Sequence, residues 1–222
     1  MTAADLLARR RSIRAFRPDP VPADVLDRIL AAAQEAPSWS NTQPYRLGLA
    51  QGALRDRLAD ELTAAFDRGS VDLAPEIPLP LSYPPELQRR RQATGYGLYE
   101  TLGIARQDHA ARHAQMRRNF TFFDAPVVLF LFAHEALGQY AALDAGVFLQ
   151  SLMLAAVDEG LGTCAEGALA MYPGPIRRCF DVPEGYKLLC GLSLGYPADD
   201  RVNGFRPARK APDELLLPVA TG

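Results

Sequence analysis

The sequence predicts a single domain that combines α-helices with a β-sheet. The 222 residues are enough for one large domain with a sizeable core. Hydrophobic residues make up 48% of the chain and charged residues 23%, as in a soluble globular protein. Helical and strand-like patterns follow one another along the whole sequence, and neither an internal repeat nor a linker divides it. We therefore treat residues 1–222 as one domain.

The first half of the chain reads as three helices and one strand. Hydrophobic patterns predict these elements: helices over 3–10, 22–35 and 53–68, and a strand over 45–50. Pro18 and Pro20 stop regular structure after the first helix, and Pro22 opens the second. A polar loop over 36–44 has the composition to cap a helix or line a site. Five prolines exclude a helix from 69–85, and we expect this loop to cover a pocket.

The second half alternates helices with apolar strands. The predicted elements are helices over 86–102, 106–120, 139–159 and 173–180, strands over 125–133 and 187–194, and an extended segment over 163–167. Gly103 joins the first two helices, and Gly160 ends the longest helix as a C-cap glycine would. The run over 125–133 is continuously apolar, which predicts a buried strand.

Charge, cysteine content and hydropathy argue against several classes of protein. A net charge of −2 gives the molecule no basic field for a polyanion, so we expect no nucleic-acid partner. The three cysteines are an odd number and lie far apart, which favours reduced thiols in the cytoplasm over disulfides. Residues 1–11 lack an apolar signal core. The most apolar helical stretch, 145–157, is too short to cross a bilayer, so we expect no membrane partner.

An arginine run near the N-terminus is the strongest candidate for an anion site. Arg9, Arg10, Arg11 and Arg14 surround Ser12. In an extended segment, alternation would place Arg10, Ser12 and Arg14 on one face, where guanidinium forks and a hydroxyl could bind phosphate. A solvent-exposed charge run is the competing interpretation. Arg206 and Arg209 form a second candidate phosphate clamp, with the same competing interpretation.

Other motifs are weaker. The glycines in 160–167 allow a flat ligand to approach backbone amides, although they also suit an ordinary turn. No phosphate-binding loop or GxGxxG opening a βαβ unit is present. His109 and His113 lie one helical turn apart, but a zinc site needs at least one more ligand, so we expect no metal.

Four segments together resemble the FMN-dependent nitroreductase family. They occur in the family's order and spacing: RRSIRAF at 10–16, APSWSNTQPY at 36–45, GLGTCAEG at 160–167 and NGFRPAR at 203–209. The resemblance spans essentially the whole chain. It implies an α+β fold in which helices surround a central mixed sheet, built as an intertwined homodimer with FMN at the interface. The 139–159 helix would pack in the dimer core, and the C-terminal extension over 196–222 would reach the partner subunit.

The resemblance also implies roles for individual residues. Arg10, Ser12 and Arg209 would hold the FMN phosphate and ribityl chain, and Arg14 would reach the pyrimidine edge of the ring. The backbone amides of Glu166 and Gly167 would face the flavin N5 and O4. The other subunit would supply one loop: Pro37, Ser38, Trp39, Ser40, Asn41 and Gln43. The remaining implied cofactor-binding residues are Arg11, Cys164, Arg206 and one arginine of the 89–91 run, for which we take Arg90.

The implied activity is a two-electron, ping-pong reduction of a small nitroaromatic or quinone-like substrate by NADPH or NADH. The flavin carries the chemistry, so no catalytic side chain is expected. Tyr45 stands where the family often has tryptophan after Gln-Pro, which leaves the substrate open. Two alternatives stay open: a flavin-dependent tailoring enzyme of the ene-reductase, dehalogenase or dehydrogenase type with a dedicated substrate, and a non-catalytic flavin-binding protein.

Overall fold

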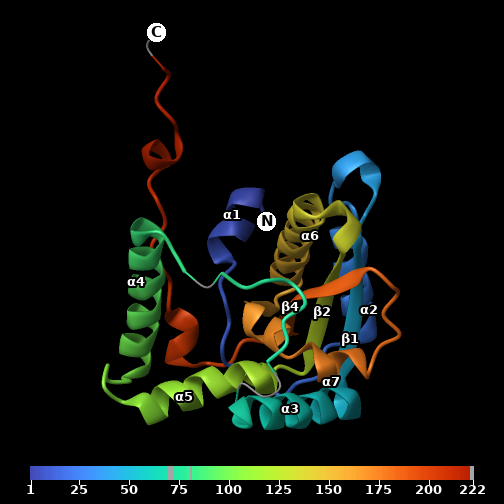
Figure 1. Cartoon of the computed structure of the whole chain (residues 1–222), viewed down its shortest axis with the longest axis horizontal. Helices are drawn as coiled ribbons and strands as arrows, with labels where there is room; N and C mark the ends of the chain where they lie inside the picture. The colour runs from blue at the N-terminus through green and yellow to red at the C-terminus, as the bar shows by residue number, and fades with distance from the viewer. Residues whose placement is uncertain (70–72, 81, 221–222) are drawn as a thin grey trace.

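The fold is a four-stranded sheet covered by helices on both faces (Figure 1). The computed structural model describes residues 1–69, 73–80 and 82–220. Residues 70–72 and 81 of the proline-rich loop, and residues 221–222 of the C-terminal extension, lie outside this description, so our expectations for those positions are not addressed.

The strands are β1 (Tyr45–Gln51), β2 (Val127–His134), β3 (Gly162–Glu166) and β4 (Tyr186–Gly195), in the spatial order β1-β2-β4-β3. The predicted α+β class is confirmed. The expectation of a mixed sheet is corrected, because all three strand pairs are antiparallel. Among the described residues, parallel pairing is confined to an isolated bridge between Ser12 and Thr163. Every residue of β2 from Val127 to Ala133 is buried, as its apolar run predicted.

Strand alternation creates one core on each face of the sheet. Val128, Phe130 and Phe132 of β2 point into the core covered by α3 (Gly52–Asp67) and α7 (Pro173–Arg177). Leu129 and Leu131 point into the other core, covered by α2 (Ala23–Gln34) and α6 (Gln139–Asp158). The helices predicted over 22–35 and 53–68 are therefore confirmed with ends that differ by one residue.

Helix α6 is longer than the stretch 145–157, which we expected to be too short to cross a bilayer. Its 20 residues have a mean hydropathy of 1.5, so length and composition alone would allow it to cross a bilayer, and our argument from shortness was wrong. The core helix of a globular protein passes the same test, and 39% of the tested stretch of α6 is buried. Phe148 and Leu152 pack on the sheet, while Tyr140, Leu143 and Val147 are exposed.

The remaining helices lie to one side of the sheet in Figure 1. They are α1 (Ala3–Arg9), α4 (Pro85–Leu102) and α5 (His109–Arg117). The helix predicted from Arg106 begins at His109 instead, because the Asp108 carboxylate accepts a hydrogen bond from the Ala111 amide and caps it there. It also ends early, and Phe122 and Phe123 adopt left-handed backbone angles in the irregular segment that follows. Gly103 closes α4 with a φ of 72°, as predicted.

The arginine run is an extended segment held between two parts of the chain. On one side, the Ile13 amide donates to the Thr163 carbonyl of β3 at 2.9 Å. On the other side, the Arg17 amide donates to Tyr196, and the Ala15 carbonyl accepts from Ala198, at 2.8 and 3.0 Å. We call residues 10–17 the arginine strand. Its backbone is fixed by segments that follow it by about 150 residues or more in the sequence.

Asn203 clamps the centre of the arginine strand. Its Oδ1 accepts hydrogen bonds from the Arg14 and Ala15 amides at 2.8 and 3.2 Å. Its Nδ2 donates to the carbonyls of Ala15 and Ala198 at 2.8 and 2.9 Å. The side chain is 4% exposed, so water cannot replace these bonds without opening the structure. The amide of Asn203 thus saturates its hydrogen-bonding capacity in holding the strand and the C-terminal segment together.

Replacing Asn203 with alanine is expected to lower the free energy of unfolding by about 2–4 kcal/mol, because four buried backbone groups lose a partner. Urea denaturation followed by circular dichroism measures this change. Asn119→Ala, which removes one local bond to the Met116 carbonyl, serves as the control and should change stability much less. Equal effects of the two substitutions would contradict the role assigned to Asn203.

Candidate functional site

A polar cavity of about 260 Å³ lies between the arginine strand, α1, α4 and the C-terminal segment. It is lined by residues far apart in sequence: Leu7, Ala8, Arg10, Arg11, Ser12, Arg14, Thr94, Phe205, Arg206, Pro207 and Arg209. We call it the arginine cavity. Both predicted arginine clusters, near the N-terminus and in the tail, meet in this one place.

The side chains of the arginine strand alternate between the interior and the cavity, as predicted. Ile13 and Ala15 are 2% and 7% exposed and point into the interior. Arg10, Ser12 and Arg14 line the arginine cavity between them. Arg11 also reaches this cavity and lines a smaller one, of about 110 Å³, together with Arg9. The extended backbone therefore turns a sequence cluster of cations into one cationic wall.

Among the described residues, the three arginines of this wall, Arg10, Arg11 and Arg14, form no ion pair, and two of them have a buried nitrogen without an acceptor. The Nε atoms of Arg10 and Arg11 are buried without a hydrogen-bond acceptor. Within residues 1–69, 73–80 and 82–220, no ion pair involves Arg10, Arg11 or Arg14. A buried guanidinium nitrogen without an acceptor is costly, and an anionic ligand removes that cost. The arrangement suits a phosphate, which accepts several charge-assisted hydrogen bonds at once.

The tail closes the cavity. Arg206 donates from Nη1 to the Ala8 carbonyl at 2.8 Å, which ties the tail to the end of α1. Arg209 donates from Nη1 to the Pro207 carbonyl at 2.9 Å. Phe205 packs against α4 at Gly97, where a Cβ atom would lie 3.0 Å from the phenyl ring.

Sequence reasoning missed Thr94 and Phe205 as lining residues. Phe205 lies within the NGFRPAR segment at 203–209, so the sequence pattern that suggested Arg206 and Arg209 could also have suggested this residue. Thr94 is an ordinary helical residue, and only the packing of α4 against the tail brings it to the cavity.

Arg90 does not line the arginine cavity. Its guanidinium pairs with the carboxylates of Glu86 and Glu214, with N–O distances of 3.4 and 3.3 Å. Of the other arginines in that run, Arg91 lies over the Tyr83 ring, with 5.3 Å between the guanidinium carbon and the ring centroid. In one chain, α4 therefore contributes Thr94 rather than Arg90 to the cavity.

The loop over 36–44 lies beyond α6 from α1 and the arginine strand (Figure 1). Its amide at Trp39 donates to both carboxylate oxygens of the buried Asp144, at 3.1 and 3.0 Å. Ser38 Oγ accepts from the Gln43 amide, and Gln43 Nε2 donates to Asn41 Oδ1. The loop residues in question are mostly exposed: Pro37, Trp39, Ser40, Asn41 and Gln43, with Ser38 half-buried. One chain does not bring them to the arginine cavity.

Backbone strain marks the same loop. Ser40, Asn41 and Gln43 have φ values of 49°, 55° and 46°, in the left-handed region that non-glycine residues rarely occupy. Trp39 is 58% exposed, and its ring centroid lies 4.7 Å from that of Tyr140 on α6. Strain that persists on a surface loop is typical of a functional constraint.

Glu166 and Gly167 end β3 and begin a short 3₁₀ turn over Gly167–Met171. The amide of Gly167, the first residue of this turn, has no partner within the turn, whereas Glu166 is paired with Gly191 in the sheet. Gly167 is exposed, whereas the Glu166 side chain is 2% exposed and accepts a hydrogen bond from the Ser193 hydroxyl. Burial raises the pKa of the Glu166 carboxyl to about 8. The Ser193 hydrogen bonds and the Arg14 charge act in the opposite direction and lower this pKa, but burial has the larger effect.

Cys164 sits two residues before Glu166 in the core. Its side chain is 2% exposed, and burial with the nearby Glu166 raises the pKa of its thiol to about 12. Cys164, Cys179 and Cys190 are free thiols. Cys164 can therefore meet a ligand through its backbone but not as a thiolate.

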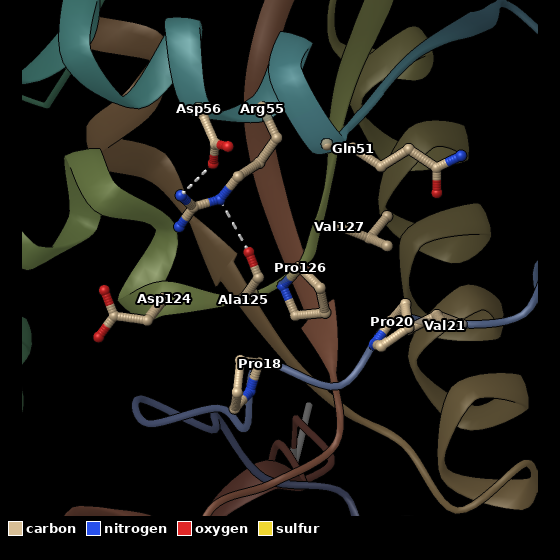
Figure 2. A pocket seen from close by; sticks show the side chains of 11 residues that line it. Pro18, Pro20, Val21, Gln51, Arg55, Asp56, Asp124, Ala125, Pro126 and Val127 are labelled. Carbon is tan, nitrogen blue, oxygen red and sulfur yellow. Dashed lines mark hydrogen bonds and ion pairs between the residues drawn. The ribbon is translucent and has the colours of Figure 1, made fainter.

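Another cavity, of about 610 Å³, lies in a different place (Figure 2). Pro18, Pro20 and Pro126 form much of its wall. Its one cation, Arg55, already donates to the Ala125 carbonyl at 3.0 Å and pairs with Asp56. No residue of our predicted site lines this cavity.

Nor do the described parts of the chain gather three or more His, Cys, Asp or Glu side chains that could hold a metal. His113 instead stacks on Phe66, with 4.8 Å between ring centroids.

The family model for the "Nitroreductase family" matches residues 7–196. This chain belongs to the nitroreductase family. The match begins at α1, ahead of the arginine strand, and ends one residue after β4. Three of the four segments that suggested the family lie within the match, and the fourth, at 203–209, follows it.

Curated relatives and solved structures agree with the family. The chain is 39% identical over 211 residues to "Nitroreductase NfnB" of Mycolicibacterium smegmatis, covering 93% of this chain and 88% of that protein. It is 34% identical over 206 residues to "4-nitrobenzoate reductase" of Pseudomonas putida, covering 92% and 90%. The crystal structure of "FMN and NADPH-dependent nitroreductase NfnB" from Sphigopyxis sp. strain HMH superposes with a TM-score of 0.94 at 35% identity, covering 100% of both chains.

The Glu166 carboxyl makes the stability of this nitroreductase-family chain depend on pH. Its pKa is about 8 in the folded state against an ordinary 4.5, so between these values the folded state binds more protons than the unfolded state. The free energy of unfolding therefore falls as pH rises through this window, by up to about 1.4 kcal/mol per pH unit from this group.

Replacing Glu166 with glutamine removes that dependence. We expect the stability of E166Q relative to the native protein to increase from about pH 5 to about pH 8 and then to level off. Urea denaturation at several pH values measures this difference. The exposed Glu100→Gln provides the control. A difference between E166Q and the native protein that stays constant across the window would contradict the burial of an ionisable Glu166.

Proposed function

We propose that this protein is an FMN-dependent oxidoreductase that uses NADPH or NADH to reduce small nitroaromatic compounds. The observation that carries the proposal is the arginine cavity, whose buried guanidinium nitrogens lack acceptors. Relatives described as nitroreductases and nitrobenzoate reductases support the reaction class. A structure described as a complex of the M. smegmatis nitroreductase with NADPH supports the reductant. The free cysteines fit a cytoplasmic location.

The cavity fits the phosphate end of FMN. Arg10 and Arg209 can each present a guanidinium to the phosphate, and Ser12 adds a hydroxyl donor. Arg11 and Arg206 line the same cavity and add positive charge. The net charge of the whole chain is −2, so this local concentration of cations is a property of the site rather than of the surface as a whole.

FMN, when bound, supplies the two-electron redox chemistry between NADPH or NADH and the acceptor. The chain's own residues bind and orient it. Arg14 lies at the β3 end of the cationic wall, where a positive charge stabilises negative charge on the pyrimidine edge of the ring. We propose that the backbone amides of Glu166 and Gly167 donate to the N5 and O4 edge, as the family resemblance implies.

One chain holds only part of such a site. The arginine cavity, at about 260 Å³, is smaller than the roughly 300–1,000 Å³ that enclose a drug-sized ligand. The strained loop residues Ser40, Asn41 and Gln43 do not line it, and Trp39 beside them is exposed. We infer that a second copy supplies this loop, together with Pro37 and Ser38, to complete the cofactor site.

The exposed side of α6 supports the same homodimer. Tyr140, Leu143 and Val147 are 53%, 59% and 36% exposed on an apolar helix. Leu215, Leu216, Leu217 and Val219 are 67–91% exposed in the C-terminal segment, which extends away from the body in Figure 1. Apolar surface of this extent favours burial against another subunit. We propose that α6 packs in the dimer core and that the 196–222 extension lies on the partner.

The proline-rich loop is fixed at one end, which supports its proposed role as a cover. The Glu76 carboxylate pairs with Arg177 and accepts from the Leu188 amide at 2.8 Å. The Ala74 amide donates to the Met171 carbonyl at 3.1 Å, at the end of the turn that begins with Gly167. The described part of the loop therefore runs beside the proposed flavin edge before it reaches α4.

The absorption spectrum of the purified protein tests the function. It is recorded anaerobically before and after NADPH, then NADH, and finally after 4-nitrobenzoate or nitrobenzene. Flavin bands that bleach with a nicotinamide cofactor and return with the nitro compound are the expected result. Bands that bleach but do not return with either nitro compound would contradict the proposed acceptor class. Absence of flavin bands after incubation with FMN would contradict the cofactor.

Arg10 and Arg9 form a matched pair within the run. Arg10→Ala is expected to weaken FMN binding about 10- to 100-fold, because the phosphate loses a charge-assisted contact. Arg9→Ala is the control, since Arg9 ends α1 and points to the Met1 sulfur. Quenching of FMN fluorescence gives both dissociation constants. Equal losses in the two variants would show that only general positive charge matters.

A substitution on the exposed side of α6 tests the proposed dimer. Leu143→Glu is expected to raise the dimer dissociation constant at least about 100-fold, because it places an unpaired carboxylate in the proposed interface. Ala64→Glu, on the exposed side of α3, is the control. Analytical ultracentrifugation measures both. A monomeric native protein, or an L143E variant that dimerises normally, would contradict the proposed interface.

A further inference from the structure

The buried Glu166 side chain occupies an unusual place behind the proposed flavin edge. Its carboxyl lies on the face of the sheet that β3 shares with Ser193 and Cys164, and the Ser193 hydroxyl donates to its Oε1. Its Oε2 is buried without a hydrogen-bond partner. The backbone amide of the next residue, Gly167, is one of the two amides assigned to the flavin. The buried carboxyl therefore belongs to the residue directly before the turn that is proposed to face the flavin.

The strand opposite Glu166 is closely packed against the turn that follows it. Gly191 lies opposite Glu166 in the β3–β4 pair, and a Cβ atom at Gly191 would meet the Leu169 side chain at 2.3 Å. Leu169 is fully buried and belongs to the turn that starts at Gly167. Leu169 therefore packs directly over Gly191, the cross-strand partner of Glu166, and helps to keep this region buried.

The charged and titratable groups around Glu166 are few. Arg14 of the arginine strand is the cation whose charge reaches the carboxyl. Cys164 and Cys190, from β3 and β4, also feel the Glu166 charge, but both thiols have a pKa of about 12 and stay neutral. Arg14 is therefore the one group that an ionised Glu166 could attract among the described residues.

We propose that Glu166 is a positioning residue: its neutral carboxyl, bonded to Ser193, keeps Arg14 available to FMN, and ionisation of that carboxyl weakens FMN binding. This inference rests on the proposed function. A buried carboxylate with an unpartnered oxygen gains most by drawing the nearest cation toward itself. Arg14 would then turn from the flavin toward Glu166, and the new negative charge would also repel the electron-rich edge of the ring.

Because FMN binding is coupled to protonation of Glu166, the affinity for FMN is expected to depend on pH. Burial raises the pKa of Glu166 to about 8, so the neutral form dominates at lower pH. FMN affinity should be constant at neutral pH and fall above about pH 8, with the dissociation constant rising up to about tenfold per pH unit. The FMN phosphate has lost its second proton by neutral pH, so its own titration does not enter this range.

The test is the FMN dissociation constant of the native protein, E166Q and S193A, measured by fluorescence quenching between about pH 7 and about pH 9.5. Glutamine is neutral and of the same shape, so E166Q should bind FMN at pH 7 as the native protein does and lose the decline at high pH. The Ser193 hydrogen bond lowers the pKa of Glu166, so S193A should move the decline to higher pH. Glu100→Gln, on the exposed face of α4, should keep the native profile.

Each other outcome overturns a defined statement. The same decline in E166Q as in the native protein, or no decline in the native protein, would overturn the role of Glu166. Failure of E166Q to bind FMN at pH 7 would overturn it as well, because the neutral side chain is proposed to be the competent one. Failure of the native protein to bind FMN at every pH would instead overturn the proposed function. A decline in S193A that does not move would overturn the Ser193 contact as its support.

Discussion

The site depends on the hydrogen bonds that hold the arginine strand extended between β3 and residues 196–198. Several cations with no carboxylate beside them repel one another, and an unrestrained segment would scatter them into solvent. Asn203 prevents this by bonding the backbone on both sides of Arg14 and Ala15. The pairing with Thr163 then sets which side chains face inward. A backbone constraint thus produces a cationic cavity, the proposed anion site, from residues that would otherwise be a surface charge run.

A second constraint is that the residues proposed to bind the cofactor lie in two separate parts of the chain. The arginine strand and the C-terminal segment meet within one chain, while the strained loop around Ser40 and Asn41 is held by Asp144 on the other side of α6. A site divided in this way, together with an exposed apolar α6, favours a homodimer over a monomer with a complete site. The helix that carries the dimer face would then also fix the distance between the two halves of each site.

Local patterns predicted most of the fold and several of the residues that line the arginine cavity. Periodicity and prolines located α2, α3 and β2 because these elements obey local rules, and alternation correctly placed Arg10, Ser12 and Arg14 together. The start of α5 was missed because Asp108 was not recognised as its cap. The antiparallel sheet and the contribution of Thr94 depend on packing between distant segments, which a sequence pattern does not contain. The contact of the Glu166 carboxyl with Ser193 likewise depends on the pairing of β3 with β4.

The central claim is that the arginine strand recognises the phosphate of the cofactor. Calorimetric titration of the flavin-free protein with FMN and with riboflavin, which has the same ring but no phosphate, tests it most directly. We predict that FMN binds at least about 100-fold more tightly, since the phosphate supplies acceptors for the buried guanidinium nitrogens of Arg10 and Arg11. Equal affinities for FMN and riboflavin would contradict the claim.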